Sequence, residues 1–379
     1  MINNSWIEVD LDKVIYNLNQ VKEFVGRTKI LGVVKANAYG LGAVETARVL
    51  EKADTDMLGV TTLSEGIRLR EAGIALPILV FSPLLEEQME RALQADLTIT
   101  ISFPEHVFQL GSAADYVGKA ANVHIKVETG MGRTGISPKE VINVVEKIIA
   151  HDKIHLEGIY THFPKATVKK TTEKQFELFN NTVENVKRLG CEQLLAHCCN
   201  SAAALLYPEM HGDMVRVGTL LYGQYPLGVP NTIDIKDPWS AKAKIIYLRR
   251  MPKGTGVGYG HEYVTKRDTY IGIIPLGFTD GFGVMPLTRA KSLTDMAKML
   301  LKTVLGYFGW SENQLKVHAG NYSYPIVGRI GMQLTMIDLG DKPHINVGDE
   351  VSIFLRRTMA DNQLERRYSF QGSKVIGTD

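Results

Sequence analysis

Short apolar runs alternate with longer amphipathic stretches between residue 12 and about residue 225. The runs are rich in Val, Ile and Leu, and we expect strands at 30–34, 57–61, 78–81, 97–101, 123–127, 155–160, 193–196 and 214–217. Between the runs, apolar residues recur every three or four positions, which places one apolar stripe along a helix. Phe176, Phe179, Val183 and Val186 form such a stripe. The chain therefore repeats the order strand, helix, strand.

The eight runs predict a closed barrel. A strand that is apolar throughout must be covered on both faces, and eight such strands, each followed by a helix, are what a closed parallel barrel requires. We therefore predict a (β/α)8 TIM-type barrel over residues 1–228. Reactive side chains of such barrels lie just past the carboxyl ends of the strands. Lys35, Lys126, His162, His197 and Arg216 occupy these positions, so we expect the functional site there.

The pattern changes after residue 228, where prolines interrupt the chain and short strands follow. We expect these strands at 270–276, 315–319, 324–330, 334–339 and 350–355, with turns at 320–321 and 340–341. A single helix is expected over 292–307, with Ser292 as its cap and Asp295 in its first turn. Residues 229–379 are therefore predicted to form a separate, mainly β domain.

Charge and cysteine content exclude several classes of function. The net charge is +2 over 379 residues, and no run of Lys and Arg is long enough to follow a nucleic acid or a membrane surface. The N-terminus lacks a secretion signal, and no apolar run has the length of a membrane helix. Three clustered cysteines, Cys191, Cys198 and Cys199, suit neither a disulfide framework nor a metal site. We expect a cytoplasmic protein without a bound metal.

Two basic residues suggest chemistry on a small molecule. A lysine at the end of the first strand, Lys35, would be partly desolvated, which favours a neutral amine that can form a Schiff base with an aldehyde. Taken alone, it would more often simply reach solvent. Arg133 carries a planar set of donors suited to a carboxylate, and an arginine bracing the turn is an equal alternative.

The motifs containing these residues resemble those of alanine racemases, which are pyridoxal-phosphate enzymes built on a barrel. The resemblance covers most of the chain and rests on segments 33–42, 123–133, 160–163, 196–203, 215–223, 256–260 and 327–338. It implies that Lys35 holds the cofactor as a Schiff base and that Arg133 binds the substrate carboxylate. The other cofactor contacts that it implies are Tyr39, His162, Asn200, Ser201, Arg216, Gly218 and Thr219. Ser201 could also be a simple helix cap.

The resemblance further implies a two-base reaction. Racemisation needs one group to remove the α-proton from one face and another to deliver a proton to the opposite face. Lys35 and Tyr259 are the expected pair, although Tyr259 between glycines would, taken alone, be a turn residue. Arg216, acting through His162, is the expected source of the positive field that activates the Tyr259 hydroxyl. Arg216 would also keep the pyridine nitrogen unprotonated, which suits racemisation.

Quaternary structure is also implied. In the family, the residues matching Tyr259 and Met332 come from the other subunit of a head-to-tail homodimer, and the Met332 N–H touches the substrate carboxylate. In many members the lysine matching Lys126 is carbamylated. The implied product is D-alanine for bacterial peptidoglycan.

Several positions depart from the family pattern and leave the substrate open. Gly331 and Gln333 replace a cysteine and an aspartate, and Phe278 replaces a tyrosine at the substrate entrance. The segment 292–307 looks inserted, and Tyr368 is a candidate for a phosphate-contacting tyrosine that the tail lacks. Alanine is therefore the leading substrate, and racemisation of serine, lysine or ornithine is the alternative. A pyridoxal-phosphate homeostasis protein, a decarboxylase and a chain without activity are more remote alternatives.

Overall fold

The larger compact unit is the predicted barrel. The computed structural model describes residues 3–284, 290, 292–307 and 315–375, and its larger unit spans Asp10–Pro238 and Ser369–Asp379. Eight parallel strands follow one another in the order β8, β7, β6, β5, β4, β3, β2, β9. Their bounds are β2 (Lys29–Val33), β3 (Met57–Val60), β4 (Ile78–Val80), β5 (Thr98–Ile101), β6 (Ala121–Lys126), β7 (Ile154–Tyr160), β8 (Leu195–His197) and β9 (Met214–Val217). All eight predicted strands are confirmed.

Bonds between the segments at β8 and β9 join the two ends of this sheet. The Ala196 N–H donates to Oδ2 of Asp213 at 2.9 Å, and the Asp213 N–H donates to the Ala196 carbonyl at 3.0 Å. The Arg216 N–H donates to the Cys199 carbonyl at 2.9 Å. The eight strands therefore surround one interior, as a barrel requires.

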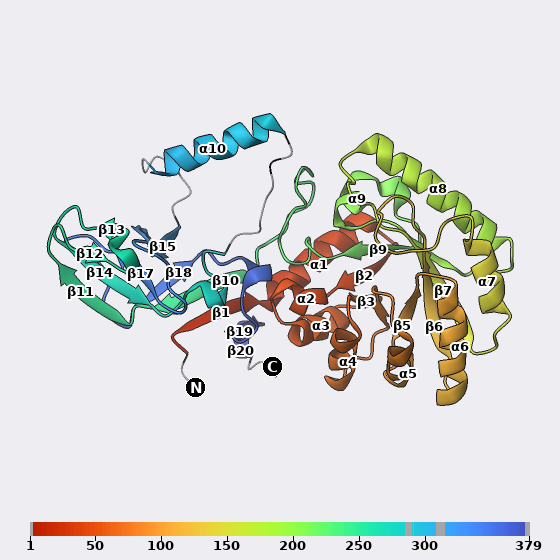
Figure 1. Ribbon diagram of the computed structural model, residues 1–379. Helices are drawn as coiled ribbons and strands as arrows, with labels where there is room; N and C mark the ends of the chain where they lie inside the picture. The colour runs from red at the N-terminus through yellow and green to blue at the C-terminus, as the bar shows by residue number, and fades with distance from the viewer. Residues whose placement is uncertain (1–2, 285–289, 291, 308–314, 376–379) are drawn as a thin grey trace. The chain divides into compact units, whose positions relative to one another are not determined.

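Helices cover the outside of the barrel (Figure 1). They are α1 (Leu11–Val25), α3 (Ala43–Lys52), α4 (Leu63–Glu71), α5 (Glu86–Gln94), α6 (Glu105–Val117), α7 (Val141–Ile149), α8 (Lys169–Lys187), α9 (Ser201–Leu206) and the 3-10 turn η1 (Pro208–Met210). The short element α2 (Lys35–Tyr39), which follows β2, is a left-handed turn. In α8 the predicted stripe is confirmed, because Phe179, Val183 and Val186 are buried. Among the described residues, none of the helices is both long and apolar enough to cross a membrane.

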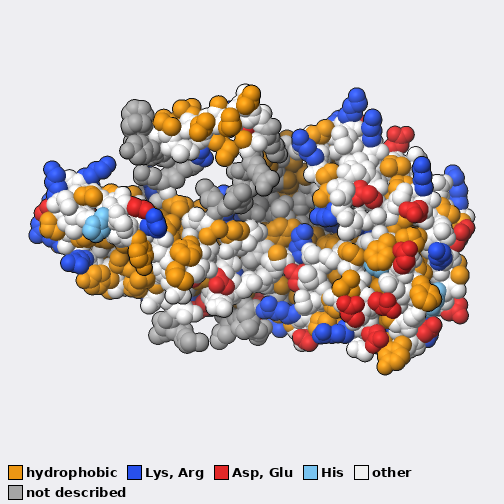
Figure 2. All heavy atoms as spheres, viewed as in Figure 1, with side chains coloured by type: hydrophobic (Ala, Val, Ile, Leu, Met, Phe, Trp, Pro, Cys, Tyr) orange, Lys and Arg blue, Asp and Glu red, His pale blue; other side chains and the backbone are white. Residues whose placement is uncertain are grey.

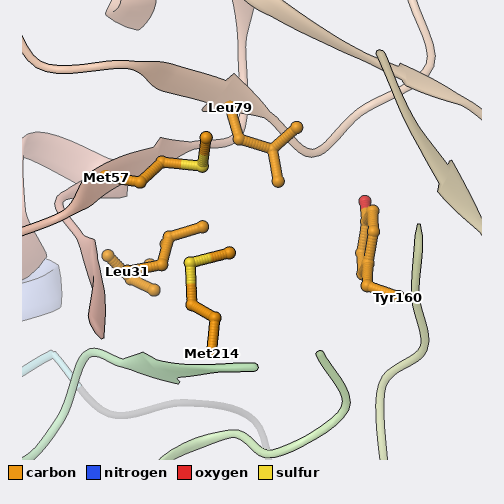
Figure 3. Packing of buried hydrophobic residues seen from close by; sticks show 6 residues of the cluster. Leu31, Met57, Leu79, Tyr160 and Met214 are labelled. Atoms are coloured by element: carbon orange, nitrogen blue, oxygen red, sulfur yellow. The ribbon is translucent and has the colours of Figure 1, made fainter. Parts of the chain in front are cut away.

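Side chains from several strands fill the barrel interior. Leu31, Met57, Leu79, Tyr160 and Met214 form one buried cluster, with contributions from β2, β3, β4, β7 and β9 (Figure 3). Each is at most 3% exposed. The interior is thus a packed core rather than a pore.

The smaller unit, Met1–Val9 with Trp239–Tyr368, is mainly β as predicted. Its strands are β1 (Ser5–Asp10), β10 (Trp239–Lys244), β11 (Tyr247–Met251), β12 (Gly256–Val257), β13 (Tyr263–Val264), β14 (Thr269–Ile274), β15 (Lys316–Ala319), β16 (Tyr322–Pro325), β17 (Thr335–Asp338), β18 (Glu350–Ile353) and β19 (Glu365–Phe370), and β20 (Ser373–Val375) follows. In one sheet β16, β15, β18, β10, β1 and β19 are neighbours in this order, and another sheet contains β11, β14 and β17.

Strand β1 was not among the predicted elements. It pairs antiparallel with β10, from Ser5 opposite Ala243 to Val9 opposite Trp239. The first residues of the chain therefore belong to the β unit, and the chain enters the barrel at Asp10, whose side chain caps α1 by accepting from the Lys13 N–H at 3.2 Å. The domain boundary at 228–229 inferred from the sequence stays a prediction.

The predicted helix near residue 300 is confirmed as α10 (Leu293–Tyr307). Ser292 caps it as expected, because the Asp295 N–H donates to Oγ of Ser292 at 3.1 Å. Apolar side chains along this helix are exposed (Figure 2), including Leu293, Leu300 and Val304. Three further short 3-10 turns lie in this unit: η2 (Tyr259–His261), η3 (Phe278–Asp280) and η4 (Arg357–Met359).

Candidate functional site

A cavity of about 390 Å³ opens at the carboxyl ends of the barrel strands. This size lies within the range of small-molecule sites. The cavity is lined by Val33, Lys35, Tyr39, Thr61, Phe81, Ser82, Pro83, Lys126, Arg133, Thr134, Tyr160, His162, Asn200, Ser201, Ala202, Arg216, Gly218, Thr219 and Pro226. The structure therefore brings together the catalytic, cofactor-binding and substrate-binding residues predicted in the barrel, at the expected end of the barrel, whereas His197, also expected there, does not line the cavity.

Lys35 stands at the start of a left-handed turn. After β2 the backbone of residues 36–39 has φ between 50° and 56°, although none of these residues is glycine. Such a conformation costs about 1–2 kcal/mol per residue, so the surroundings must hold it. The Gly40 N–H donates to the Ala36 carbonyl at 3.0 Å, and the Ala36 N–H donates to Oε1 of Glu65 at 2.6 Å. Strain of this kind is concentrated at functional sites.

The Lys35 amine is held toward its neutral form. Burial lowers the pKa of Lys35, and the positive charge of Arg133 lowers it further, while Glu65 opposes the shift. A neutral amine is the nucleophilic form, so the surroundings suit attack on an aldehyde. Within the described residues, no hydrogen bond or ion pair engages the Arg133 guanidinium, which leaves it available for a carboxylate.

Lys126 is a second perturbed amine in the cavity wall. Its side chain is 3% exposed, and its Nζ donates to Oγ1 of Thr134 at 2.5 Å. Burial, together with the charges of Arg133 and Arg216, lowers the pKa of Lys126 to about 8. The amine is therefore partly neutral near physiological pH.

Arg216, in β9, is a buried residue of the cavity wall and is bonded on several sides. Its two Nη groups donate to the carbonyls of Thr161, His197 and Cys198 at 2.7, 2.9 and 3.1 Å. Nδ1 of His197 lies 3.0 Å from Nη1, and Nδ1 of His162 lies 3.4 Å from Nη2. These bonds fix the plane of the guanidinium.

The neighbours of Arg216 are neutral. Burial and the nearby cations, above all Arg216, lower the pKa of His162 to about 3. The Tyr160 ring lies 5.3 Å from the guanidinium carbon of Arg216, and burial raises the pKa of Tyr160 to about 12. The contact predicted between Arg216 and His162 is therefore present, with His162 as an uncharged acceptor.

The first turn of α9 and the end of β9 form a polar pocket. The Asn200 side chain, not Ser201, caps α9, since its Oδ1 accepts from the N–H groups of Ala202 and Ala203 at 3.1 Å. The interpretation of Ser201 as a simple cap is therefore wrong. Its hydroxyl instead accepts from the Gly218 N–H at 3.0 Å.

This pocket has the chemistry expected for a phosphate ester. The Thr219 hydroxyl is buried and has no hydrogen-bond partner among the described residues, so a ligand that offers an acceptor would satisfy it. A Cβ at Gly218 would lie 2.7 Å from the Tyr39 hydroxyl, so glycine allows that hydroxyl to approach. With Lys35 and Arg216 in the same cavity, the residues fit pyridoxal phosphate.

The remaining two predicted residues lie in the smaller unit and are both exposed. Tyr259 begins η2 and is 73% exposed, and Met332 is 63% exposed. The Thr279 N–H and hydroxyl donate to the Met332 carbonyl at 3.1 and 2.6 Å. The Phe278 N–H donates to the Gly331 carbonyl at 3.0 Å. The approach of Tyr259 and Met332 to a barrel cavity stays a prediction.

Some lining residues were not singled out from the sequence. Thr134 immediately follows Arg133, and Tyr160 ends the strand before His162, so position alone could have indicated them. Phe81, Ser82 and Pro83 follow β4 without a charged group, and no signal marked them. Tyr368, left open as a phosphate contact, is 1% exposed within β19.

Comparisons with known sequences cover both units. Residues 9–226 match the family profile of the alanine racemase N-terminal domain, and residues 239–368 match that of the alanine racemase C-terminal domain. The chain is 36% identical over 355 residues to alanine racemase 2 of Oceanobacillus iheyensis, covering 93% of this chain and 84% of that protein. It is 36% identical over 351 residues to the alanine racemase of Halothermothrix orenii, covering 92% and 86%.

Solved structures are similar over almost the whole chain. The alanine racemase of Clostridium difficile 630 is 31% identical with a TM-score of 0.87, over 99% of this chain and 98% of that one. The alanine racemase of Bacillus anthracis with bound L-Ala-P is 26% identical with a TM-score of 0.84, over 99% and 97%.

Proposed function

Because the chain belongs to the alanine racemase family, a family of isomerases, we propose that it interconverts L-alanine and D-alanine with pyridoxal 5′-phosphate. The observation that carries this proposal is the Lys35 amine, half-buried at the cavity, with its pKa lowered by burial and by Arg133. An amine in this state can attach an aldehyde, and Arg133 can hold the carboxylate of the substrate beside it.

Different barrel residues would bind different parts of the cofactor. Tyr39, Ser201, Gly218 and Thr219 would hold the phosphate, with His162 and Asn200 beside the cofactor. Arg216 would face the ring nitrogen and, being permanently protonated, would leave that nitrogen without a proton. When bound, the cofactor withdraws electrons from the α-carbon of an amino acid and so makes its proton removable.

Two groups of this chain would move the proton. Lys35 would act on one face of the α-carbon and Tyr259 on the other, since a change of configuration requires removal and delivery on opposite sides. Tyr259 is exposed on its own unit, where a second protein surface can reach it. We propose that Tyr259 and Met332 complete the site of a partner subunit in a head-to-tail homodimer, and that the Met332 N–H binds the substrate carboxylate.

Lys126 would support Arg133 in this arrangement. Since its pKa is lowered to about 8, part of the amine is neutral and can react with carbon dioxide to form a carbamate. A carbamate would bring a negative charge toward Arg133 and orient the guanidinium for the substrate. The free cysteines Cys191, Cys198 and Cys199 suit a reducing compartment, and we propose that the enzyme makes D-alanine for peptidoglycan in the cytoplasm.

A broader substrate range is a second candidate. Phe278 exposes its ring on η3 next to the Met332 loop, with 48% of its surface accessible, and Gln333 adds no charge there. The loss of a carboxylate and a phenol changes the charge and the width of the entrance, so the selection among alanine, serine, lysine and ornithine can differ from that of the family.

Chiral chromatography across a panel of L-amino acids tests the proposal. The protein supplied with pyridoxal phosphate should convert L-alanine to a racemic mixture, and Lys35→Ala should abolish both the turnover and the visible absorbance of the bound cofactor. Lys174→Ala, on the outside of the barrel in α8, is the matched control and should change neither. No turnover of any amino acid by the parent protein would overturn the proposal.

A further inference from the structure

A line of polar side chains crosses the barrel interior behind Arg216. Nη1 of Arg216 lies 3.0 Å from Nδ1 of His197, and Nε2 of His197 lies 2.9 Å from Nδ1 of His124. Nε2 of His124 then lies 3.3 Å from Oε2 of Glu157. The line therefore connects β9, β8, β6 and β7. Both histidines are fully buried, and Glu157 is partly exposed.

The line of side chains ends at a carboxylate, which supplies the negative counter-charge that the direct contacts of Arg216 lack. Within the described residues, the partners of its guanidinium are carbonyl oxygens and imidazole nitrogens, and none is a carboxylate. A buried cation without a counter-charge is costly. Glu157 is the carboxylate that the line reaches through the two histidines.

Arg216 at one end of the line and Glu157 at the other determine which nitrogen of each histidine carries a hydrogen. Arginine offers only donors and a carboxylate only acceptors. Nδ1 of His197 must therefore carry a lone pair, and its Nε2–H donates to Nδ1 of His124. The remaining hydrogen of His124 is then on Nε2, which lies 3.3 Å from Oε2 of Glu157 but outside hydrogen-bond geometry. A proton added to either ring would place two donors against each other.

Packing holds the two rings in this orientation. The Tyr160 ring stacks on His197, with centroids 5.0 Å apart and planes within 11° of each other. A Cβ at Gly158 would lie 2.6 Å from the His124 ring, so the ring is pressed against bare backbone. The register shift between Val123 and His124 in β6 places His124 there.

We propose that Glu157 and His124 are positioning residues, which act through His197 to hold Arg216 against the ring nitrogen of bound pyridoxal phosphate. The functional consequence rests on the proposed function above, whereas the arrangement of protons does not. Neither residue lines the cavity, so neither touches the substrate.

The pKa shifts of the groups along and beside the line are consistent with this assignment of protons. Burial, with Arg216 and His124, lowers the pKa of His197 well below its usual value. The contact with His124 lowers the pKa of Glu157, burial opposes this shift, and Thr98 and Lys29 lower it further. Tyr160 faces His197 as a neutral phenol, since burial raises its pKa to about 12.

Histidine nitrogen NMR tests the order of protons directly. In the holoenzyme labelled with ¹⁵N-histidine, the resonances of His124 and His197, assigned by single substitution, should both show the neutral Nε2–H tautomer across a range of about pH 6 to 9. A protonated imidazole or an Nδ1–H tautomer at either residue would overturn the proposal.

Paired substitutions at His124 test the positioning role. Glutamine keeps one acceptor and one donor, whereas phenylalanine keeps the ring size and neither. His124→Phe should therefore raise the dissociation constant of pyridoxal phosphate about tenfold and shift the visible spectrum of the holoenzyme, while His124→Gln should restore both in large part. His124→Phe with the parent's affinity and spectrum would contradict the proposal.

Two further variants keep the test decisive. Where His124→Phe does not fold, Glu157→Gln retains an acceptor and removes the charge, and it should weaken cofactor binding in the same direction. An unchanged affinity would refute the role of Glu157. Asp115→Asn, which breaks a surface pair with His151 at 3.7 Å, is the control and should change neither readout. A parent protein that takes up no cofactor would overturn the proposed function, and the same NMR measurement on the cofactor-free protein would still test the assignment of protons.

Discussion

Arg216→Lys is expected to destabilise the barrel and to weaken cofactor binding together. The guanidinium reaches five acceptor atoms, namely three carbonyl oxygens and two imidazole nitrogens. The two Nη groups carry four hydrogens and an ammonium group carries three, so at least one buried acceptor loses its partner. Each unsatisfied buried acceptor costs about 1–3 kcal/mol. The free energy of unfolding should therefore fall by at least about 1–3 kcal/mol.

Urea unfolding followed by circular dichroism measures the loss of stability, and titration with pyridoxal phosphate measures binding. Arg70→Lys is a matched control, because Arg70 donates to four backbone carbonyls, those of Ile74, Leu76, Ala95 and Asp96, away from the cavity. It should lose stability by the same mechanism while keeping its cofactor affinity. An Arg216→Lys protein with the parent's unfolding midpoint and affinity would refute the role of these bonds.

Three further predictions concern other parts of the site. Tyr259→Phe should retain the cofactor spectrum but lose racemisation by at least about 100-fold, most severely from the L-enantiomer; parent rates in both directions would exclude a two-base reaction. Burial and two cations lower the pKa of Lys126 to about 8. Between about pH 8 and 10.5 the folded chain therefore binds fewer protons at Lys126 than the unfolded chain does. Burial of the charged amine thus lowers the free energy of unfolding at pH 7, and this destabilisation disappears as the pH rises. A free Lys126 amine would make Lys126→Met raise the unfolding midpoint at pH 7, with the gain shrinking toward pH 10. The proposed carbamate predicts instead that Lys126→Met destabilises the protein at pH 7, and a raised midpoint would contradict it. Gly218→Ala would place a Cβ 2.7 Å from the Tyr39 hydroxyl and should cost about 1–3 kcal/mol of stability; an unchanged thermal midpoint would contradict the close approach.

The barrel could be predicted because its strands are buried on both faces. The runs at β2 and β3 are continuous apolar sequences and the run at β9 contains one charged residue, Arg216; each is found within one or two residues of its predicted bounds. In the β unit the pattern is weaker. Strand β11 carries Arg249 and Arg250 and is largely exposed, and β19 buries Arg366 on its inner face. In a sequence, a buried arginine cannot be distinguished from an arginine on the surface. The hydrophobicity pattern therefore did not predict these two strands.

The site could be predicted where chemistry accompanies a strand end. Lys35, Arg133 and Arg216 carry recognisable groups, and all line one cavity. Contacts between strands distant in sequence could not be predicted. His124 and Glu157 are 33 positions apart and meet only because β6 and β7 pair with a register shift.

Complementation between two inactive variants tests the central claim most directly, namely that Lys35 and Tyr259 act on one carbon from two subunits. Lys35→Ala and Tyr259→Ala proteins, each inactive alone, are mixed, exchanged and assayed for D-alanine, with native mass spectrometry to confirm mixed dimers. In a mixed dimer one site has both substitutions and the other has neither, so activity should recover to about a quarter of the parent value. Mixed dimers without activity would contradict the shared site.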